Sequence, residues 1–237
     1  MHDNRPVPAA TAAAGLDNPF WSSLQSVHRG IALRAGDAVA RYPADFAPFL
    51  GIAHAGAATR DALEALVAPG EAVYLIGVAP DPVPDGWRLE AFRPLAQMTC
   101  DAPLEEVDGP GIIALTPAHR DDVLALTALV YPHYFRARTM ELGRYFGIYH
   151  EGRLAAMAGE RLGTADACEM SAICTHPDFN GRGHARRLTT MLANDTLRGG
   201  RLPFLHVSHE NPRAEGLYAR MGFRLRRDIG FWSLSRT

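Results

Sequence analysis

The segment over residues 171–198 constrains the fold of this 237-residue chain more than any other. Residues 172–175 form a short apolar run that stops before Pro177, which is typical of a buried strand. Turn residues fill positions 177–183. Apolar residues then recur at helical spacing: Ala185, Leu188, Met191 and Leu192. The sequence therefore predicts a strand, a glycine-containing loop and a helix in direct succession.

Two glycines, Gly181 and Gly183, lie just before the predicted helix. Glycine there lets backbone N–H groups approach a ligand closely, and the helix N-terminus adds roughly half a positive charge. Arg182 can add a charge-assisted hydrogen bond to a phosphate, and Ala185 is small enough for close backbone approach. These features favour a diphosphate site. The alternative is that the glycines only shape a turn.

Other phosphate and metal motifs do not match this chain. No Gly-Lys-Ser/Thr follows the glycines, as it would in the phosphate loop of ATPases, and the third glycine of the dinucleotide fingerprint is missing. The sequence has no HExxH, no paired CxxC and no histidine cluster, so we expect no metal site.

Composition narrows the class of protein. The formal net charge of −2 gives no electrostatic case for nucleic acid as a partner. Three cysteines (Cys100, Cys168 and Cys174) are too few for a disulfide framework, and an odd number cannot all pair. This favours a reducing, cytoplasmic compartment. No apolar run resembles a signal peptide or approaches the roughly 18 residues that span a bilayer. We therefore expect a soluble cytoplasmic protein without a membrane partner. The sequence does not indicate its oligomeric state.

The first part of the chain predicts a scaffold of short strands. Residues 1–19 are rich in Ala and Pro, which predicts a disordered N-terminus. Within residues 20–104 we expect a helix capped by Thr59 and an unbroken strand over 87–98. The acidic, Pro- and Gly-containing residues 101–111 predict a linker.

The second part, over residues 105–237, alternates strands with helices. Thr116-Pro117 predicts a helix start, residues 133–145 are rich in aromatics and arginine, and a last strand is expected over 223–234. This order predicts an α/β (α+β) fold with a mixed sheet.

Two motifs in this part resemble a known family. Residues 175–185 carry Thr-x-Pro followed by Asn-Gly-Arg-Gly-His-Ala, which is similar to the acetyl-CoA signature Gln/Arg-x-x-Gly-x-Gly/Ala of the GNAT superfamily of N-acyltransferases. Asn180 stands where Gln or Arg is usual. Asn211-x-x-Ala-x-x-Leu-Tyr218 and the following Gly222-Phe223 resemble the second half of the same fold. The resemblance covers about residues 112–234. Glu169-Met170 with the later Thr-x-Pro resembles the glycine N-acyltransferase-like branch.

The resemblance implies a fold and an activity. It implies a mixed, largely antiparallel central sheet with flanking helices over residues 105–237, which would bind acetyl-CoA. Residues 20–104 would form a degenerate GNAT-like half and one wall of the acceptor pocket. The implied enzyme is an N-acetyltransferase that moves an acyl group from acyl-CoA to the amine of a small molecule or amino acid by direct attack. The alternatives are a catalytically silent acyl-CoA-binding or regulatory module, and a protein N-acetyltransferase.

The resemblance also assigns residues to the acyl-CoA site. The backbone of Ile173, Cys174 and Thr175 would contact pantetheine where their strand splays from residues 205–208. Asn211 would bond the pantetheine arm or cap a helix. The residues expected around the diphosphate are Asn180, Gly181, Arg182, Gly183, His184 and Ala185.

Two residues are candidates for proton transfer. Strand alternation places Glu169 on one face with Ile173, where desolvation would raise its pKa toward that of a general base. The alternatives are pairing of Glu169 with Arg153 or Arg161, and a water or a histidine (His206 or His209) as the base. Tyr218 matches the family's acid for the leaving thiolate; the alternative is an aromatic ring that only packs. Cys174 alternates to the opposite face, so we expect no Cys–Glu pair.

Overall fold

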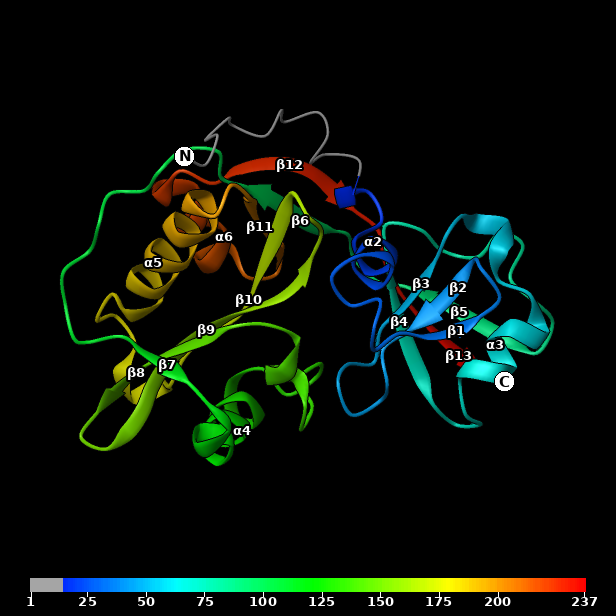
Figure 1. Ribbon diagram of the computed structural model, residues 1–237, viewed down its shortest axis with the longest axis horizontal. Helices are drawn as coiled ribbons and strands as arrows, with labels where there is room; N and C mark the ends of the chain where they lie inside the picture. Colours follow the sequence, from blue (N-terminus) through cyan, green and yellow to red (C-terminus); the bar gives the residue numbers. More distant parts are fainter. Residues whose placement is uncertain (1–14) are drawn as a thin grey trace.

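A seven-stranded sheet forms the larger part of the protein, whose computed structural model describes residues 15–237 (Figure 1). In sheet order its strands are β12 (Arg224–Ile229), β6 (Leu95–Thr99), β11 (Leu202–Ser208), β10 (Ala167–Thr175), β9 (Arg153–Gly163), β8 (Tyr145–His150) and β7 (Ile113–Leu115). Only the β10–β11 pair is parallel. The predicted mixed, largely antiparallel sheet is confirmed.

Helices cover both faces of this sheet. Helices α5 (His184–Arg198) and α6 (Pro212–Met221) lie on one face, and α4 (Arg120–Val130) lies on the other (Figure 1). On β9, Ala156 and Ala158 pack beneath α5 and α6, whereas Met157 packs on the α4 side, as the period-two alternation of a strand requires. Pro117 starts a 3-10 turn, η2 (Pro117–His119), that leads into α4 and confirms the predicted helix start.

The smaller part contains two three-stranded sheets. One has the order β1 (Leu33–Ala35), β2 (Val39–Arg41), β3 (Leu50–Ile52); the other has the order β4 (Ala72–Ile76), β13 (Phe231–Arg236), β5 (Trp87–Ala91). Helix α2 (Pro19–Gln25) and helix α3 (Arg60–Leu66) pack on them, and the Thr59 hydroxyl accepts a hydrogen bond from the Ala62 N–H, which confirms the predicted cap. The remaining 3-10 turns are η1 (Ala55–Ala57), η3 (Thr139–Leu142) and η4 (Pro177–Phe179).

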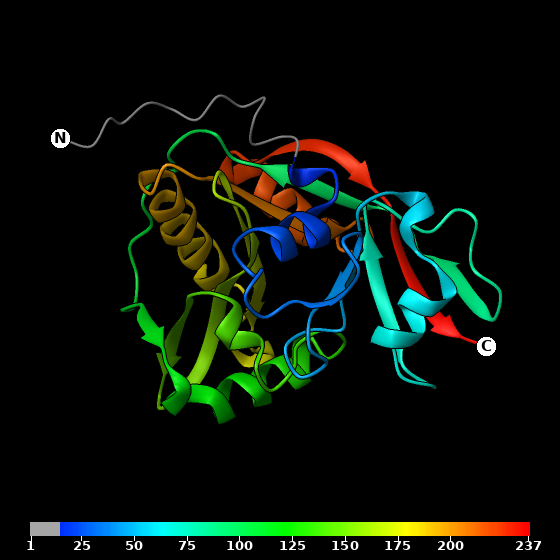
Figure 2. The same cartoon turned by 45° about the vertical axis from the view of Figure 1, so that its right-hand side comes forward.

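The two parts exchange strands. The expected unbroken strands over 87–98 and 223–234 are wrong, because each is divided into two strands that belong to different sheets. Pro94, which has no N–H for a ladder, lies in the first break. Gly230 lies in the second, where a Cβ would meet the Trp232 ring at 2.0 Å. Figure 2 shows the red C-terminal strand continuing from the large sheet into the small one.

The predicted division into residues 20–104 and 105–237 stays a prediction. Strand β6 from the first range lies inside the large sheet, and β13 from the second lies between β4 and β5. Residues 1–14 of the predicted disordered N-terminus lie outside the described residues. Leu16 is buried in the core, and the Asn18 amide donates to the Ile52 carbonyl at 2.7 Å. None of the described helices has the length and apolar character to cross a membrane.

Candidate functional site

Strands β10 and β11 separate after Glu169 and Phe204, before the middle of either strand. They pair from Ala167 opposite Leu202 to Glu169 opposite Phe204 and no further. Beyond that point β10 bulges against β9 between Ser171 and Cys174, with Ala172 in the left-handed region at φ +50°. The predicted splay is confirmed, and it leaves backbone groups of β10 free to bind an extended ligand.

The loop after β10 presents the N-terminus of α5. Gly181 and Gly183 both have φ +78°, a conformation that favours glycine. Gly183 is the N-cap of α5, and no side chain caps this helix start. The free N–H groups of the first turn can therefore bind an anion.

A groove of about 460 Å³ joins this helix start to the splayed strands. It contains Ile173, Thr175, the whole of 180–185, Asn211 and Tyr218, so nearly all of the predicted acyl-CoA residues meet there. The groove also contains residues that the sequence analysis missed: Phe179, Arg186, Arg213, Ala214, Leu217 and Arg220. The arginines add positive charge that suits a ligand with several phosphates. Arg186 and Arg213 lie on the first turns of two predicted helices, and Arg220 lies beside Tyr218. These positions could have identified the three arginines from the sequence.

His184 supplies independent evidence of a ligand in the groove. Its side chain is 4% exposed, and neither ring nitrogen has a hydrogen-bond partner among the described residues. Burial and the nearby Arg182 lower its pKa, which leaves the ring neutral with one donor and one acceptor. Buried polar atoms without partners are rare in native proteins, so a bound molecule is the natural partner.

Asn211 and Tyr218 both belong to α6. The Asn211 side chain accepts a hydrogen bond from the Ala214 N–H at 3.1 Å, so it caps the helix, one of its two expected roles. The Tyr218 ring packs against Phe223, yet within residues 15–237 its hydroxyl has no hydrogen-bond partner. Burial raises the Tyr218 pKa, so this hydroxyl stays protonated at neutral pH and can donate a proton or hydrogen bond.

Cys174 does not line the groove. Its side chain packs on the α4 side of the sheet with Met157, and burial raises its pKa to about 12. A thiol in that environment is neither a nucleophile nor a metal ligand. Only its backbone is available to a ligand. Among residues 15–237, no group of three or more His, Cys, Asp or Glu side chains could hold a metal ion.

The alternation expected along β10 is wrong, because the bulge between Ser171 and Cys174 reverses it. Met170 and Ile173 both pack toward α5, so Ile173 does not share a face with Glu169, and Cys174 does not lie on the face opposite Glu169.

Glu169 lies beneath the site rather than in the groove. It is 1% exposed, and it accepts hydrogen bonds from Nε and Nη2 of Arg161, each at 2.8 Å, and from His206 Nδ1 at 2.7 Å. Burial by itself would raise its pKa, but Arg161 and His206 outweigh burial and hold the pKa at about 2. The expected rise in pKa is therefore wrong, and pairing with Arg161, one of the open alternatives, is observed.

A chain of polar side chains extends this pair across five adjacent strands. Arg226 Nη1 on β12 donates to Gln97 Oε1 on β6 at 2.7 Å. Gln97 Nε2 donates to His206 Nε2 on β11 at 3.0 Å, and His206 Nδ1 bonds Glu169 on β10. These contacts assign the Nδ1–H tautomer to His206. Residues up to 129 positions apart meet here, so no local pattern in the sequence could reveal the chain.

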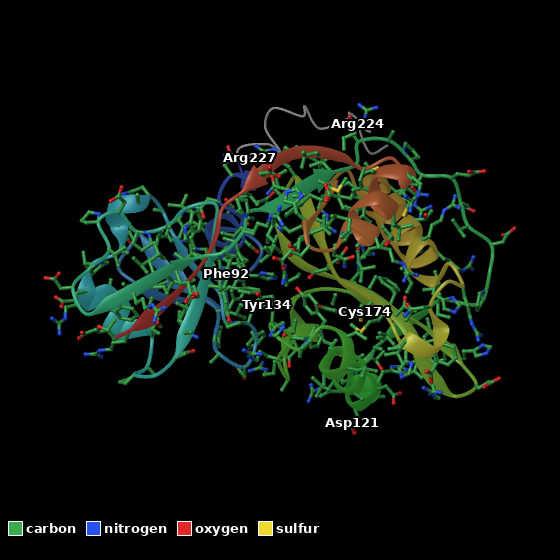
Figure 3. The ribbon with its side chains drawn as sticks, turned by 180° about the vertical axis from the view of Figure 1, so that it is seen from behind. Phe92, Asp121, Tyr134, Cys174, Arg224 and Arg227 are labelled. Atoms are coloured by element: carbon green, nitrogen blue, oxygen red, sulfur yellow. The ribbon has the colours of Figure 1, made fainter. Side chains whose placement is uncertain are left out.

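A second cavity of about 290 Å³ lies between the two parts of the protein. Its polar lining comes from Arg93, Arg161, His206, Ser208 and Glu210. Its aromatic lining comes from both parts: Phe20, Phe49, Phe92, Tyr131, Tyr134 and Phe231. We call this cavity the aromatic pocket. Figure 3 labels Phe92 and Tyr134, which meet there from the small sheet and from the segment before η3.

The groove and the aromatic pocket adjoin at the end of β11. Ser208 and Glu210 line the aromatic pocket, and the next residue, Asn211, lines the groove. Tyr131 lines the aromatic pocket, and it lies close enough to Tyr218 in the groove to act electrostatically on that hydroxyl. A ligand in the groove and a ligand in the aromatic pocket would therefore lie close to each other near the splay.

Comparisons with known proteins agree with this arrangement. A family model described as FR47-like protein matches residues 145–232. A crystal structure from Novosphingobium aromaticivorans, described as "Putative Acetyltransferase from the GNAT family", is 33% identical with a TM-score of 0.84, over 94% of this chain and 98% of that one. A GCN5-related N-acetyltransferase from Kribbella flavida shares the fold, with 14% identity and a TM-score of 0.58, over 98% and 96% of the two chains. No curated protein matches the sequence.

Proposed function

Because the chain belongs to the GNAT family of acetyltransferases, we propose that it transfers an acetyl group from acetyl-CoA to the amine of a small molecule. The observation that carries this proposal is the meeting of a cationic groove and an aromatic pocket at the splay of β10 and β11. The glycine N-acyltransferase-like branch expected from the sequence is not part of the proposal.

The groove fits acetyl-CoA on its own chemistry. The α5 N-terminus, Arg182 and the unpartnered His184 would take the diphosphate, and the free backbone of β10 would take the pantetheine amides. Asn180 keeps a neutral amide donor where related chains place Gln or Arg.

The acceptor side fits a small molecule better than a protein tail. Residues of the smaller part, including Phe20, Phe49 and Phe92, close one wall of the aromatic pocket. Its volume of about 290 Å³ suits a compact ligand, whereas a peptide needs an open groove.

The chemistry requires no covalent enzyme intermediate. The lone pair of the neutral amine attacks the thioester carbonyl, the C–N bond forms, and the C–S bond then breaks. Backbone N–H groups of β10 would stabilise the oxyanion, and the Tyr218 hydroxyl would protonate the leaving thiolate. The attacking nitrogen also loses a proton. A carboxylate with a pKa of about 2 accepts protons poorly, so we assign that proton to an ordered water and give Glu169 a positioning role.

Calorimetric titration of acetyl-CoA, followed by thiol-release assays with small amines, tests the proposal. We expect stoichiometric binding and measurable transfer. Binding without transfer to any amine would support the silent acyl-CoA-binding module instead. Absence of binding would overturn the assignment of the groove.

A further inference from the structure

Arg161 has hydrogen-bonding capacity that the protein itself does not use. Its side chain is 10% exposed and lines the aromatic pocket. Nε and Nη2 donate to Glu169, but the nearest partner of Nη1 is the Tyr131 hydroxyl at 3.4 Å, which is too long for a strong hydrogen bond. A buried guanidinium with a poorly satisfied Nη1 group favours an additional acceptor supplied by a ligand.

The surroundings hold Arg161 in one position. Glu169 accepts two hydrogen bonds from one edge of the guanidinium, and the centre of the Phe49 ring lies 4.9 Å from the central carbon of the guanidinium. Glu169 is itself held by a hydrogen bond from His206 Nδ1 to its Oε1. A guanidinium fixed in this way is preorganised for a planar anion such as a carboxylate, because little side-chain entropy remains to be lost on binding.

The other charges along the pocket indicate which anion it takes. Arg93, an exposed residue, adds a second cation to the lining. Glu210 is the only carboxylate among the described lining residues, and it lies next to Asn211 at the end that adjoins the groove. A ligand with its anion near Arg161 and its amine near Glu210 would therefore place the amine toward the thioester.

The aromatic rings define the remainder of the ligand. Tyr134 and Phe231 have ring centroids 5.9 Å apart, and both line the pocket with Phe20 and Phe92. Such a surface favours an apolar or aromatic group.

We propose that the acceptor is an amino acid with an aromatic or apolar side chain, whose carboxylate binds Arg161 and Arg93. This inference rests on the proposed function, because it concerns the acceptor of the same reaction. Arg161 and Arg93 are the residues that determine specificity for the carboxylate, and Glu169 is a positioning residue that acts through Arg161.

The test compares L-phenylalanine, 2-phenylethylamine and 3-phenylpropionate, which share a ring but differ in amine and carboxylate. We expect L-phenylalanine to have at least about tenfold higher kcat/KM than 2-phenylethylamine, and 3-phenylpropionate to inhibit competitively against the amino acid. L-leucine and isoamylamine form a second pair for an aliphatic side chain.

Variants assign the effect to the arginine. R161M leaves the buried Glu169 carboxylate without its arginine and risks misfolding, so R161M/E169Q, which removes both charges, is made beside it. We expect binding of 3-phenylpropionate to fall at least about tenfold in the double variant and severalfold in R93A. R88M, at an exposed arginine outside both cavities, is the matched control and should bind as the wild type does.

The outcomes separate the inference from the function on which it rests. If amines without a carboxylate react as well as the amino acids, the proposed function stands and the inference falls. If 3-phenylpropionate binds independently of Arg161 and Arg93, the inference also falls. If the protein transfers acetyl to no amine in the thiol-release assays but binds 3-phenylpropionate through Arg161, the proposed function fails while the carboxylate site stands.

Discussion

Arg161 and Glu169 form a two-bond ion pair across β9 and β10, with Nε to Oε2 and Nη2 to Oε1 both at 2.8 Å. Each side chain is almost wholly buried, so each depends on the other for compensation of its charge. The pair also connects the aromatic pocket to the polar chain through His206 and Gln97. Its removal should therefore affect both stability and acceptor binding.

The first prediction concerns the stability of E169Q. Loss of the carboxylate leaves Arg161 buried and uncompensated, which costs about 3–5 kcal/mol in comparable buried pairs. We expect the free energy of unfolding in urea at pH 7 to fall by about 3 kcal/mol, with part of this recovered in R161M/E169Q. A loss below about 0.5 kcal/mol would contradict the importance of the pair.

The same pair predicts a pH dependence. The folded-state pKa of Glu169 is about 2, below its ordinary value of 4.5, so its stabilisation is complete above pH 4.5 and is lost as the pH falls toward 2. Wild-type unfolding free energy should decline through this window more steeply than that of E169Q. Parallel pH profiles for the two proteins would show that Glu169 is not ionised as described.

The second residue with a testable role is Tyr218. Y218F removes the hydroxyl that would protonate the thiolate, and general acids of this kind contribute about 10²- to 10⁴-fold. We expect kcat to fall by about 10²-fold while the acetyl-CoA Kd changes less than about twofold. Y145F is the matched control, because the Tyr145 hydroxyl is buried without a partner and lies outside both cavities. An unaltered kcat in Y218F would remove Tyr218 from the acid role.

The glycine loop gives a prediction that separates strain from binding. Gly183 and Gly200 lie at opposite ends of α5 with φ +78° and +73°, and both face open space. Alanine at either should cost about 1 kcal/mol of stability through the left-handed backbone. Only G183A should weaken acetyl-CoA binding, by about tenfold, because Gly200 is remote from the groove. Equal acetyl-CoA affinities for G183A and G200A would show that the glycine loop does not bind the phosphates.

What could be predicted from the sequence was local. The loop of Gly181 and Gly183 and the helix after it follow from fewer than thirty consecutive residues, because backbone conformation and helical periodicity act over that range. The cap at Thr59 follows for the same reason. The groove could therefore be predicted in large part, although three of its arginines and the apolar residues Phe179, Ala214 and Leu217 were missed.

What could not be predicted depends on contacts between distant residues. The breaks near Pro94 and at Gly230 divide each expected strand between two sheets. Only pairing with the distant strands β4 and β11 decides which half joins which sheet. Glu169 was expected to have a raised pKa, with pairing to Arg153 or Arg161 as the alternative. Its pKa is lowered because Arg161 and His206 reach it from neighbouring strands, and only the strand pairing selects Arg161 and adds His206.

The last prediction uses the unpartnered ring of His184. In the protein without ligand, both ring nitrogens are buried and unsatisfied, which costs free energy that an apolar side chain of similar size would not incur. We therefore expect H184L to raise the free energy of unfolding by about 1 kcal/mol and to weaken acetyl-CoA binding by about tenfold. Urea denaturation and calorimetric titration measure the two effects on the same preparation.

H184L is thus expected to raise the free energy of unfolding and to lower the affinity for acetyl-CoA. Only a histidine that binds the ligand predicts both changes. If His184 only supported the fold, its substitution would lower the free energy of unfolding. If it lay at the rim without contacting the ligand, its substitution would change neither the free energy of unfolding nor the affinity for acetyl-CoA. The lowered pKa of His184 adds a second readout, since phosphate beside the ring favours its cationic form. Titrations near pH 6 in buffers of different ionisation enthalpy should show proton uptake on acetyl-CoA binding by the wild type and less by H184L. Equal proton uptake in the two proteins would mean that His184 does not contact the ligand.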